Sequence, residues 1–114
     1  MRNIFYRTKG GKVGFLKGTL KMYDEQYFEL EDGTYREEKE FVEEIEKTSP
    51  FPIDLVKTGD YVNGGQVIVA NTNYNYIMVA LPDYEELQTI TNDEIESIVT
   101  KEQFELSKFY VRYE

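Results

Sequence analysis

Histidine, cysteine and tryptophan are all absent from this chain of 114 residues. Without cysteine or histidine there is no disulfide, no thiol nucleophile, no imidazole base and no zinc or iron site of the usual kind. Carboxylates alone could still hold calcium or magnesium, but no D-x-D-x-D-G loop occurs. The composition therefore predicts a protein that is not an enzyme, with no catalytic residues, no metal site and no cofactor.

Long apolar runs are missing as well. No apolar stretch approaches the ~18 residues of a membrane span, and no charged-then-apolar leader follows Met1. These absences predict a cytoplasmic protein that neither enters a membrane nor is exported.

Aromatic residues are plentiful by contrast. Ten tyrosines and seven phenylalanines make up 15% of the chain, within a total apolar content of 40%. This is far too many for a disordered segment, so we expect an ordered core. The length allows one compact domain or two very small modules.

The charge is acidic and unevenly distributed. The formal net charge is −9. Residues 1–21 carry six basic and no acidic side chains, whereas residues 22–49 carry eleven acidic and three basic ones. The two patches either pair within the fold or leave a basic surface free to meet phosphates. An acidic surface repels nucleic acid and attracts basic partners.

The first half of the chain alternates between strands and turns. Leu16, Leu20 and Met22 share one face of a period-two pattern, which predicts a half-buried strand. Asp32-Gly33 predicts a hairpin turn of type I′, whose two central residues need positive φ. The strands are predicted over residues 3–8, 12–24 and 26–31.

A single acidic helix is predicted next. Thr34 and Glu37 fit a capping box, and an apolar stripe follows them. The helix should run for about three turns and end near Thr48, because Pro50 and Pro52 disfavour helix before them. This break divides the chain into residues 1–49 and 50–114.

The second half is predicted to form five short strands. They are a strand that begins at Ile53, strands at 66–72, 74–82 and 95–99, and a last strand at 108–113. Residues 85–94 are interpreted as a polar excursion, and a capping box of Thr100 and Gln103 starts one helical turn. This order predicts an α+β, mostly β fold: a small SH3-like barrel at 50–114, with N-terminal β-hairpins and the acidic helix packed on it.

A weak internal echo accompanies this pattern. Strand, turn, aromatic strand, turn and Glu-Ile-Glu occur twice, about fifty residues apart. The echo indicates either two small β-modules that share one core or, as we prefer, the repetitiveness of short β-proteins.

Two kinds of side chain suggest a protein-binding surface. The outward glutamates of the helix could imitate a row of phosphates and compete for a basic groove. Tyrosines in or beside turns supply amphipathic contact area at low entropic cost. The candidate protein-binding residues are Glu38, Glu40, Glu43, Glu44, Tyr23, Tyr27, Tyr74 and Tyr76.

Two other chemistries have weaker signals. Arg7, Lys9 and Lys12 flank Gly10-Gly11 and could hold a phosphate-bearing ligand, although the spacing is not that of a P-loop. Paired carboxylates could act as acid and base, but they lie in turns or on an exposed helix, where water would surround them.

A set of turn and core positions in the second half of the chain can be compared with known proteins. These positions are Asp54, Leu55, Gly59, Asp60, Val62, Asn63, Gly64, Ile98, Val99, Thr100, Gln103 and Phe104. In these residues the chain resembles the closing segment of short proteins encoded by phages and prophages of Gram-positive bacteria. The resemblance covers about the last sixty residues, and nothing comparable covers the first fifty. It implies a shared scaffold and no catalytic residue; some phage proteins of this kind inhibit host defence, anti-CRISPR proteins among them.

The sequence therefore predicts a non-catalytic, phage-type inhibitor, a monomer or small homo-oligomer. It should bind a host protein that has a basic or nucleic-acid-binding surface. A signal-sequestering, nucleotide-binding protein is the first alternative. An SH3-like nucleic-acid-binding module is the second, and the net charge of −7 over residues 51–114 disfavours it.

Overall fold

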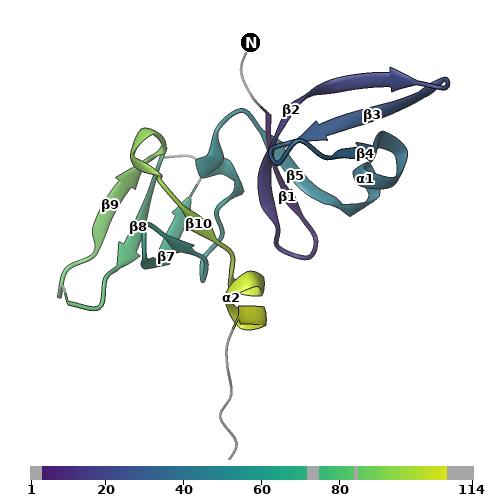
Figure 1. Cartoon of the computed structure of the whole chain (residues 1–114). Coiled ribbons are helices and arrows are strands. Elements are labelled where there is room, and N and C mark those ends of the chain that lie inside the picture. Colours follow the sequence, from purple (N-terminus) through teal and green to yellow (C-terminus); the bar gives the residue numbers. More distant parts are fainter. Residues whose placement is uncertain (1–3, 72–74, 84, 108–114) are drawn as a thin grey trace, which may run out of the picture.

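The protein is mostly β, as the computed structural model shows for residues 4–71, 75–83 and 85–107. In this part of the chain two antiparallel five-stranded sheets stand side by side, accompanied by two α-helices (Figure 1). One of the sheets curls into a half-barrel. The predicted α+β, mostly β fold class is confirmed.

The first sheet has the strand order β4-β3-β2-β1-β5. Helix α1 lies between β4 and β5 along the chain. The elements are β1 (Ile4–Thr8), β2 (Val13–Met22), β3 (Glu25–Leu30), β4 (Tyr35–Glu37), α1 (Glu38–Glu44) and β5 (Ile45–Ser49).

The second sheet has the strand order β10-β6-β7-β8-β9. It follows a short 3-10 helix, η1, and helix α2 comes after its last strand. The elements are η1 (Pro52–Leu55), β6 (Tyr61–Val62), β7 (Gly65–Asn71), β8 (Tyr76–Ala80), β9 (Gln88–Thr91), the 3-10 helix η3 (Asn92–Glu94), β10 (Ile98–Val99) and α2 (Lys101–Ser107).

Both sheets follow one plan. Four consecutive strands form a meander, a short helix follows, and the fifth strand returns to pair with the first. In the second sheet this is the SH3-like order. Ile45 packs on the core of the first sheet and Ile95 on that of the second, each within a Glu-Ile-Glu triplet. The echo in the sequence therefore marks a repeated topology.

The acidic helix is shorter than predicted at both ends. Thr34 does not cap it, because the Thr34 amide and hydroxyl both donate to Asp32 Oδ1, at 3.0 and 2.6 Å. The N-cap residue is Glu37, which makes no side-chain capping bond. Residues 35–37 and 45–49 are strands instead, since pairing with β3 and β1 overrides their helical pattern.

The element boundaries of the second half also differ from prediction. Of the first predicted strand, the start at Ile53 belongs to η1 and only Tyr61–Val62 forms a strand, β6, and the polar excursion 85–94 contains β9 and η3. The helical turn before the last SH3-like strand is therefore η3, not 100–107. The capping box of α2 is confirmed: the Gln103 amide donates to Thr100 Oγ1 at 3.2 Å, and the Thr100 amide to Gln103 Oε1 at 3.3 Å. The strand predicted at 108–113 lies outside the described residues.

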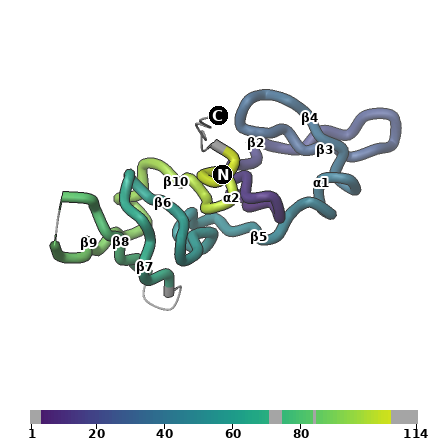
Figure 2. The backbone as a smooth tube through the Cα atoms, turned by 90° about the horizontal axis from the view of Figure 1, so that it is seen from below, coloured from purple at the N-terminus to yellow at the C-terminus, as the bar shows by residue number. Residues whose placement is uncertain are grey.

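Each sheet packs on its own core cluster. Tyr6, Leu30 and Phe41 form the buried cluster of the first sheet, where α1 covers one face and does not pack on the barrel. The molecule is flat, with extents of 55 × 48 × 20 Å, and Figure 2 shows the two sheets spread out on either side of α2. The second cluster comprises Ile53, Val56, Val62, Val67, Ile77, Val79 and Ile90.

Candidate functional site

A buried arginine joins the two halves of the molecule. Alternation along β1 turns Tyr6 to the core of the first sheet and Arg7 to the opposite face. The Arg7 guanidinium donates to the Leu55 carbonyl at 2.9 Å and forms a bidentate pair with Asp60. Arg7 is 1% exposed and Asp60 is fully buried, so the pair is shielded from water.

Further contacts tie this pair to α2. Asp60 accepts hydrogen bonds from the backbone amides of Lys57, at 2.7 Å, and of Lys101, at 3.0 Å. Glu102 accepts a further hydrogen bond from Arg7, at 3.0 Å. Burial by itself would lower the pKa of Arg7, but the hydrogen bond and charge of Asp60 raise it above the usual value.

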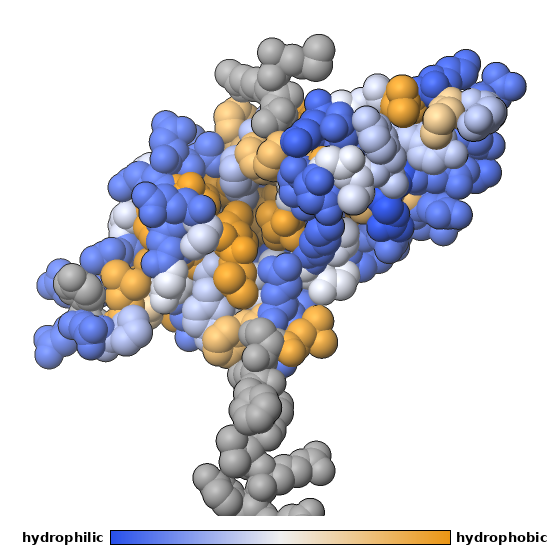
Figure 3. Space-filling model, viewed as in Figure 1, coloured by the Kyte–Doolittle hydropathy of each residue, from blue (hydrophilic) through white to orange (hydrophobic). Residues whose placement is uncertain are grey.

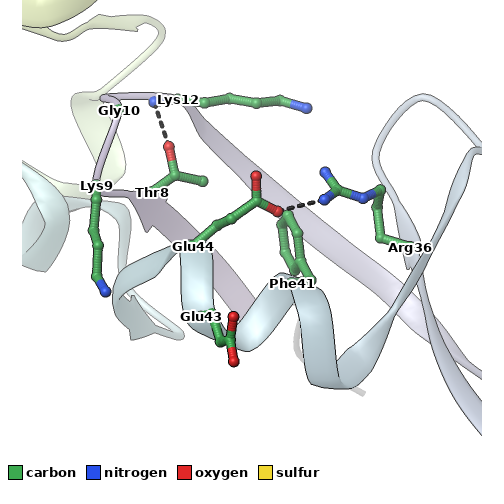
Figure 4. Close-up of a pocket in the computed structure, with 8 residues that line it drawn as sticks. All are labelled: Thr8, Lys9, Gly10, Lys12, Arg36, Phe41, Glu43 and Glu44. Atoms are coloured by element: carbon green, nitrogen blue, oxygen red, sulfur yellow. Dashed lines mark hydrogen bonds and ion pairs between the residues drawn. The ribbon is translucent and has the colours of Figure 1, made fainter.

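The predicted basic ligand site does not assemble, because Arg7 has no exposed surface to offer. Only Lys9 and Lys12 of the predicted set are exposed, and they leave the β1–β2 turn in different directions (Figure 4). Both line a pocket of about 430 Å³, together with Arg36 of β4.

Acidic side chains line this pocket together with the basic ones. Glu44 is ion-paired with Arg36 (Figure 4), and Glu43 is a further residue that lines the pocket. Lys12 Nζ is 3.6 Å from Glu31 Oε1. A polyanion such as a nucleotide would therefore meet carboxylates as well as ammonium groups.

The glycines of the β1–β2 turn have a packing role. Gly11 has φ +93°, and a Cβ there would lie 2.7 Å from Thr100 Oγ1. The buried Thr100 hydroxyl donates to the Gly11 carbonyl at 2.5 Å. Only glycine lets the turn approach the start of α2 this closely.

The acidic helix presents most of its predicted residues to solvent. Phe41 anchors it, with its ring 5.0 Å from that of Tyr6. Glu40, Glu43 and Glu44 are exposed and Glu38 is half-buried. Glu44 pairs with Arg36, whereas the other three make no ion pair with any cation of the described residues.

The predicted tyrosines are divided between the two sheets. Tyr23 is 89% exposed at the tip of the β2–β3 hairpin, where Tyr23 and Asp24 both have positive φ, as a type I′ turn requires. Tyr27 is half-buried on β3. Tyr76 is half-buried on β8, at the other end of the molecule from α1 (Figure 1). Tyr74 lies outside the described residues.

Sequence reasoning missed an apolar surface on the first sheet. A β-bulge between Leu16 and Gly18 shifts the alternation of β2. Leu16 therefore packs against the core, while Leu20 and Met22 point to the other side, 40% and 42% exposed. The prediction that these three share one face is wrong, and the glycine after Lys17 was the available signal of a bulge.

The buried Tyr6 donates a hydrogen bond to a partly exposed carboxylate, and this contact should make stability depend on pH in the alkaline range. Its hydroxyl donates to the Glu31 carboxylate, at 3.0 and 3.1 Å. Burial, followed by the hydrogen bond and charge of Glu31, raises the pKa of Tyr6 far above its usual value. An unfolded tyrosine loses its proton near pH 10, whereas folded Tyr6 keeps it, so the unfolded state binds fewer protons and stability falls as the pH rises.

Tyr6→Phe is therefore expected to cost about 1 kcal/mol at neutral pH and to make the alkaline loss shallower. Urea unfolding of both proteins between pH 8 and 11.5 measures this. Parallel stability curves above pH 10 would contradict the assignment.

Within the described residues, no group of three or more carboxylates is placed to hold a metal ion, and no helix is long and apolar enough to cross a membrane. Comparison with family models, with curated proteins and with solved structures gives no match.

Proposed function

We propose that the protein is a non-catalytic inhibitor that docks on a basic, nucleic-acid-binding surface of a bacterial host protein in the cytoplasm. The acidic face of α1, formed by Glu40 and Glu43 with Glu38 and Glu44 beside them, makes the contact. The resemblance of residues 54–113 to phage proteins supports a target in host defence, such as a CRISPR effector.

The free carboxylates of α1 carry this proposal. Glu40 and Glu43 are exposed and have no ion-pair partner among the described cations. They are three residues apart on the helix, a rise of about 4.5 Å. Duplex DNA carries one charge per about 1.7 Å of axis, and displacing its counterions drives binding to basic grooves. An anchored row of carboxylates competes for the same lysines and arginines.

The anchoring of α1 supports the proposal further. Phe41 is buried on the opposite side of the helix, between the rings of Tyr6 and Phe28. The helix backbone that carries the carboxylates is thus held in place before binding, which lowers the entropic cost of association. Residues 22–49 carry eleven acidic and three basic side chains, so the surroundings of the helix favour a basic partner too.

The nucleotide-binding alternative has less support. Arg7 is buried in its pair with Asp60, and the pocket beside Lys9 and Lys12 contains Glu43 and Glu44. Direct nucleic-acid binding is opposed by the net charge of −9.

Charge reversal at Glu40 and Glu43 tests the proposal. Immobilised wild-type protein should retain a nucleic-acid-binding protein from bacterial lysate, identified by mass spectrometry. Glu40→Lys with Glu43→Lys should weaken the affinity for that protein roughly tenfold or more and flatten its dependence on salt, because two interfacial charges change sign. Titration calorimetry at three salt concentrations measures both effects.

Glu85→Lys with Glu86→Lys is the matched control. Both residues are exposed and lie in the second half of the chain. Their replacement by lysine changes the net charge by the same amount as the replacement of Glu40 and Glu43. Equal losses in the two double variants would attribute the effect to overall charge and reject α1 as the contact.

A further inference from the structure

The side of the first sheet opposite α1 carries an exposed apolar surface. Directly paired residues of antiparallel strands project to the same side. Leu20 pairs with Tyr27, Met22 with Glu25, and Tyr35 with Glu29. Their neighbours in the strands, such as Phe28, face the core. We call Leu20, Met22, Tyr27 and Tyr35, with Glu25, Glu29 and Glu37, the outer face.

The second half of the molecule covers only one end of this side. Near β1, Arg7 reaches Asp60, and Phe5 and Phe15 line a groove of about 220 Å³ against Pro52 and Ile98. Figure 3 shows apolar side chains gathered in the hollow between the two sheets. Farther along β2, Leu20 is 40% and Met22 42% exposed, and Tyr35 of β4 is 49% exposed. The apolar strip thus continues beyond the part that the protein itself covers.

The charges around the outer face indicate what it binds. Among the described residues, Glu25 and Glu37 share one cation, Lys39, at 3.7 and 3.1 Å. Glu29 makes no ion pair within the described part of the chain, so this side keeps an acidic excess. A second copy would bring like charges into contact, which opposes self-association. An apolar segment bordered by lysine or arginine can pack on the apolar residues of the outer face and pair with the glutamates at its edge.

We infer that the outer face is a second docking surface, which binds a partner segment whose apolar side chains are flanked by lysine or arginine. It lies across the sheet from α1 and is a site separate from the acidic helix. Leu20 and Met22 supply the apolar contact, Tyr27 and Tyr35 supply amphipathic area, and Glu29 pairs with the basic flank.

The test uses the full ¹⁵N-labelled chain and two synthetic peptides, one of alternating lysine and leucine and one with glutamate in place of lysine. We expect the lysine peptide to shift the amide resonances of β2, β3 and β4, and the glutamate peptide to have no effect. Leu20→Ser with Met22→Ser should reduce the affinity for the lysine peptide about tenfold, because two apolar contacts are lost.

Ile68→Ser is the matched control. Ile68 is a strand residue of the second sheet with a similar exposure of 44%, so its replacement should leave the affinity unchanged. The amide spectrum of each variant shows that it is folded before affinities are compared.

Three results would overturn the inference. They are equal binding of the two peptides, unchanged affinity of the Leu20/Met22 variant, and resonance shifts confined to α1 or the second sheet. Loss of peptide binding in the Glu40/Glu43 variant but not in the Leu20/Met22 variant would reject the outer face and leave the acidic helix as the binding surface. The opposite pattern would support the outer face.

Discussion

Arg7→Met is expected to lower the free energy of unfolding by about 3–5 kcal/mol, because Asp60 would remain buried without its cation. Asp60 is fully shielded from solvent, and its two remaining donors are the backbone amides of Lys57 and Lys101. These amides cannot replace a full positive charge. Urea unfolding followed by circular dichroism measures the loss.

Two further variants make the test specific. Lys57→Met removes the cation of a partly exposed pair with Glu46 and should cost no more than about 1 kcal/mol. Arg7→Met combined with Asp60→Leu removes both buried charges and should recover much of the stability lost in Arg7→Met. If Arg7→Met were no more damaging than Lys57→Met, the buried pair would not hold the halves together.

The position of Arg7 explains why the free energy of unfolding depends strongly on the Arg7–Asp60 pair. Among the described residues, the core of the first sheet has three fully buried apolar side chains, and a core of that size stabilises a module of some fifty residues poorly by itself. Arg7 connects this sheet to Asp60 in the turn before β6 and to Glu102 on α2. Stability of the first sheet therefore depends on the second.

Local chemistry made several features of the fold predictable. Asn63 and Gly64 both have positive φ and join β6 to β7 in a tight turn. A hairpin also forms at Asp32-Gly33, between β3 and β4, but the predicted type I′ turn is wrong, because only Gly33 has positive φ. The capping box of Thr100 and Gln103 starts α2. In each case the residues that decide the structure lie within a few positions of one another.

The features that the sequence did not predict depend on pairing between strands that are distant along the chain. Residues 45–49 carry a helical pattern but become a strand because β1 pairs with them. The bulge in β2 reverses the exposure of Leu20 and Met22, since one added residue moves every later side chain to the other face.

Distant contacts also explain why only some residues of the candidate site could be predicted from the sequence. The helix glutamates follow from composition, and they lie on α1. Arg7 could not be separated from Lys9 and Lys12, because its partners Asp60 and Glu102 are more than fifty residues away. Tyr76 was grouped with Tyr23, although Tyr76 lies on β8 of the second sheet and Tyr23 in the β2–β3 turn of the first.

Phe41→Ala is expected to lower the free energy of unfolding by about 3–5 kcal/mol, because a large cavity would form in the small core of the first sheet. Phe41 is 1% exposed, packs edge-on against Tyr6 and Phe28, and lies 5.2 Å from the Arg36 guanidinium. Three elements therefore lose contacts at once. Thermal and urea unfolding measure the change.

Val42→Ala is the control, because the next residue of the same helix is 52% exposed and should change stability by no more than about 0.5 kcal/mol. The comparison also bears on function. Phe41 is the only fully buried residue of α1, so its loss should free Glu40 and Glu43 from their fixed positions and weaken partner binding even in buffer where the variant stays folded. Val42→Ala should preserve binding; equal affinities for both variants would mean that the glutamates act through charge alone and not through the position that the core gives them.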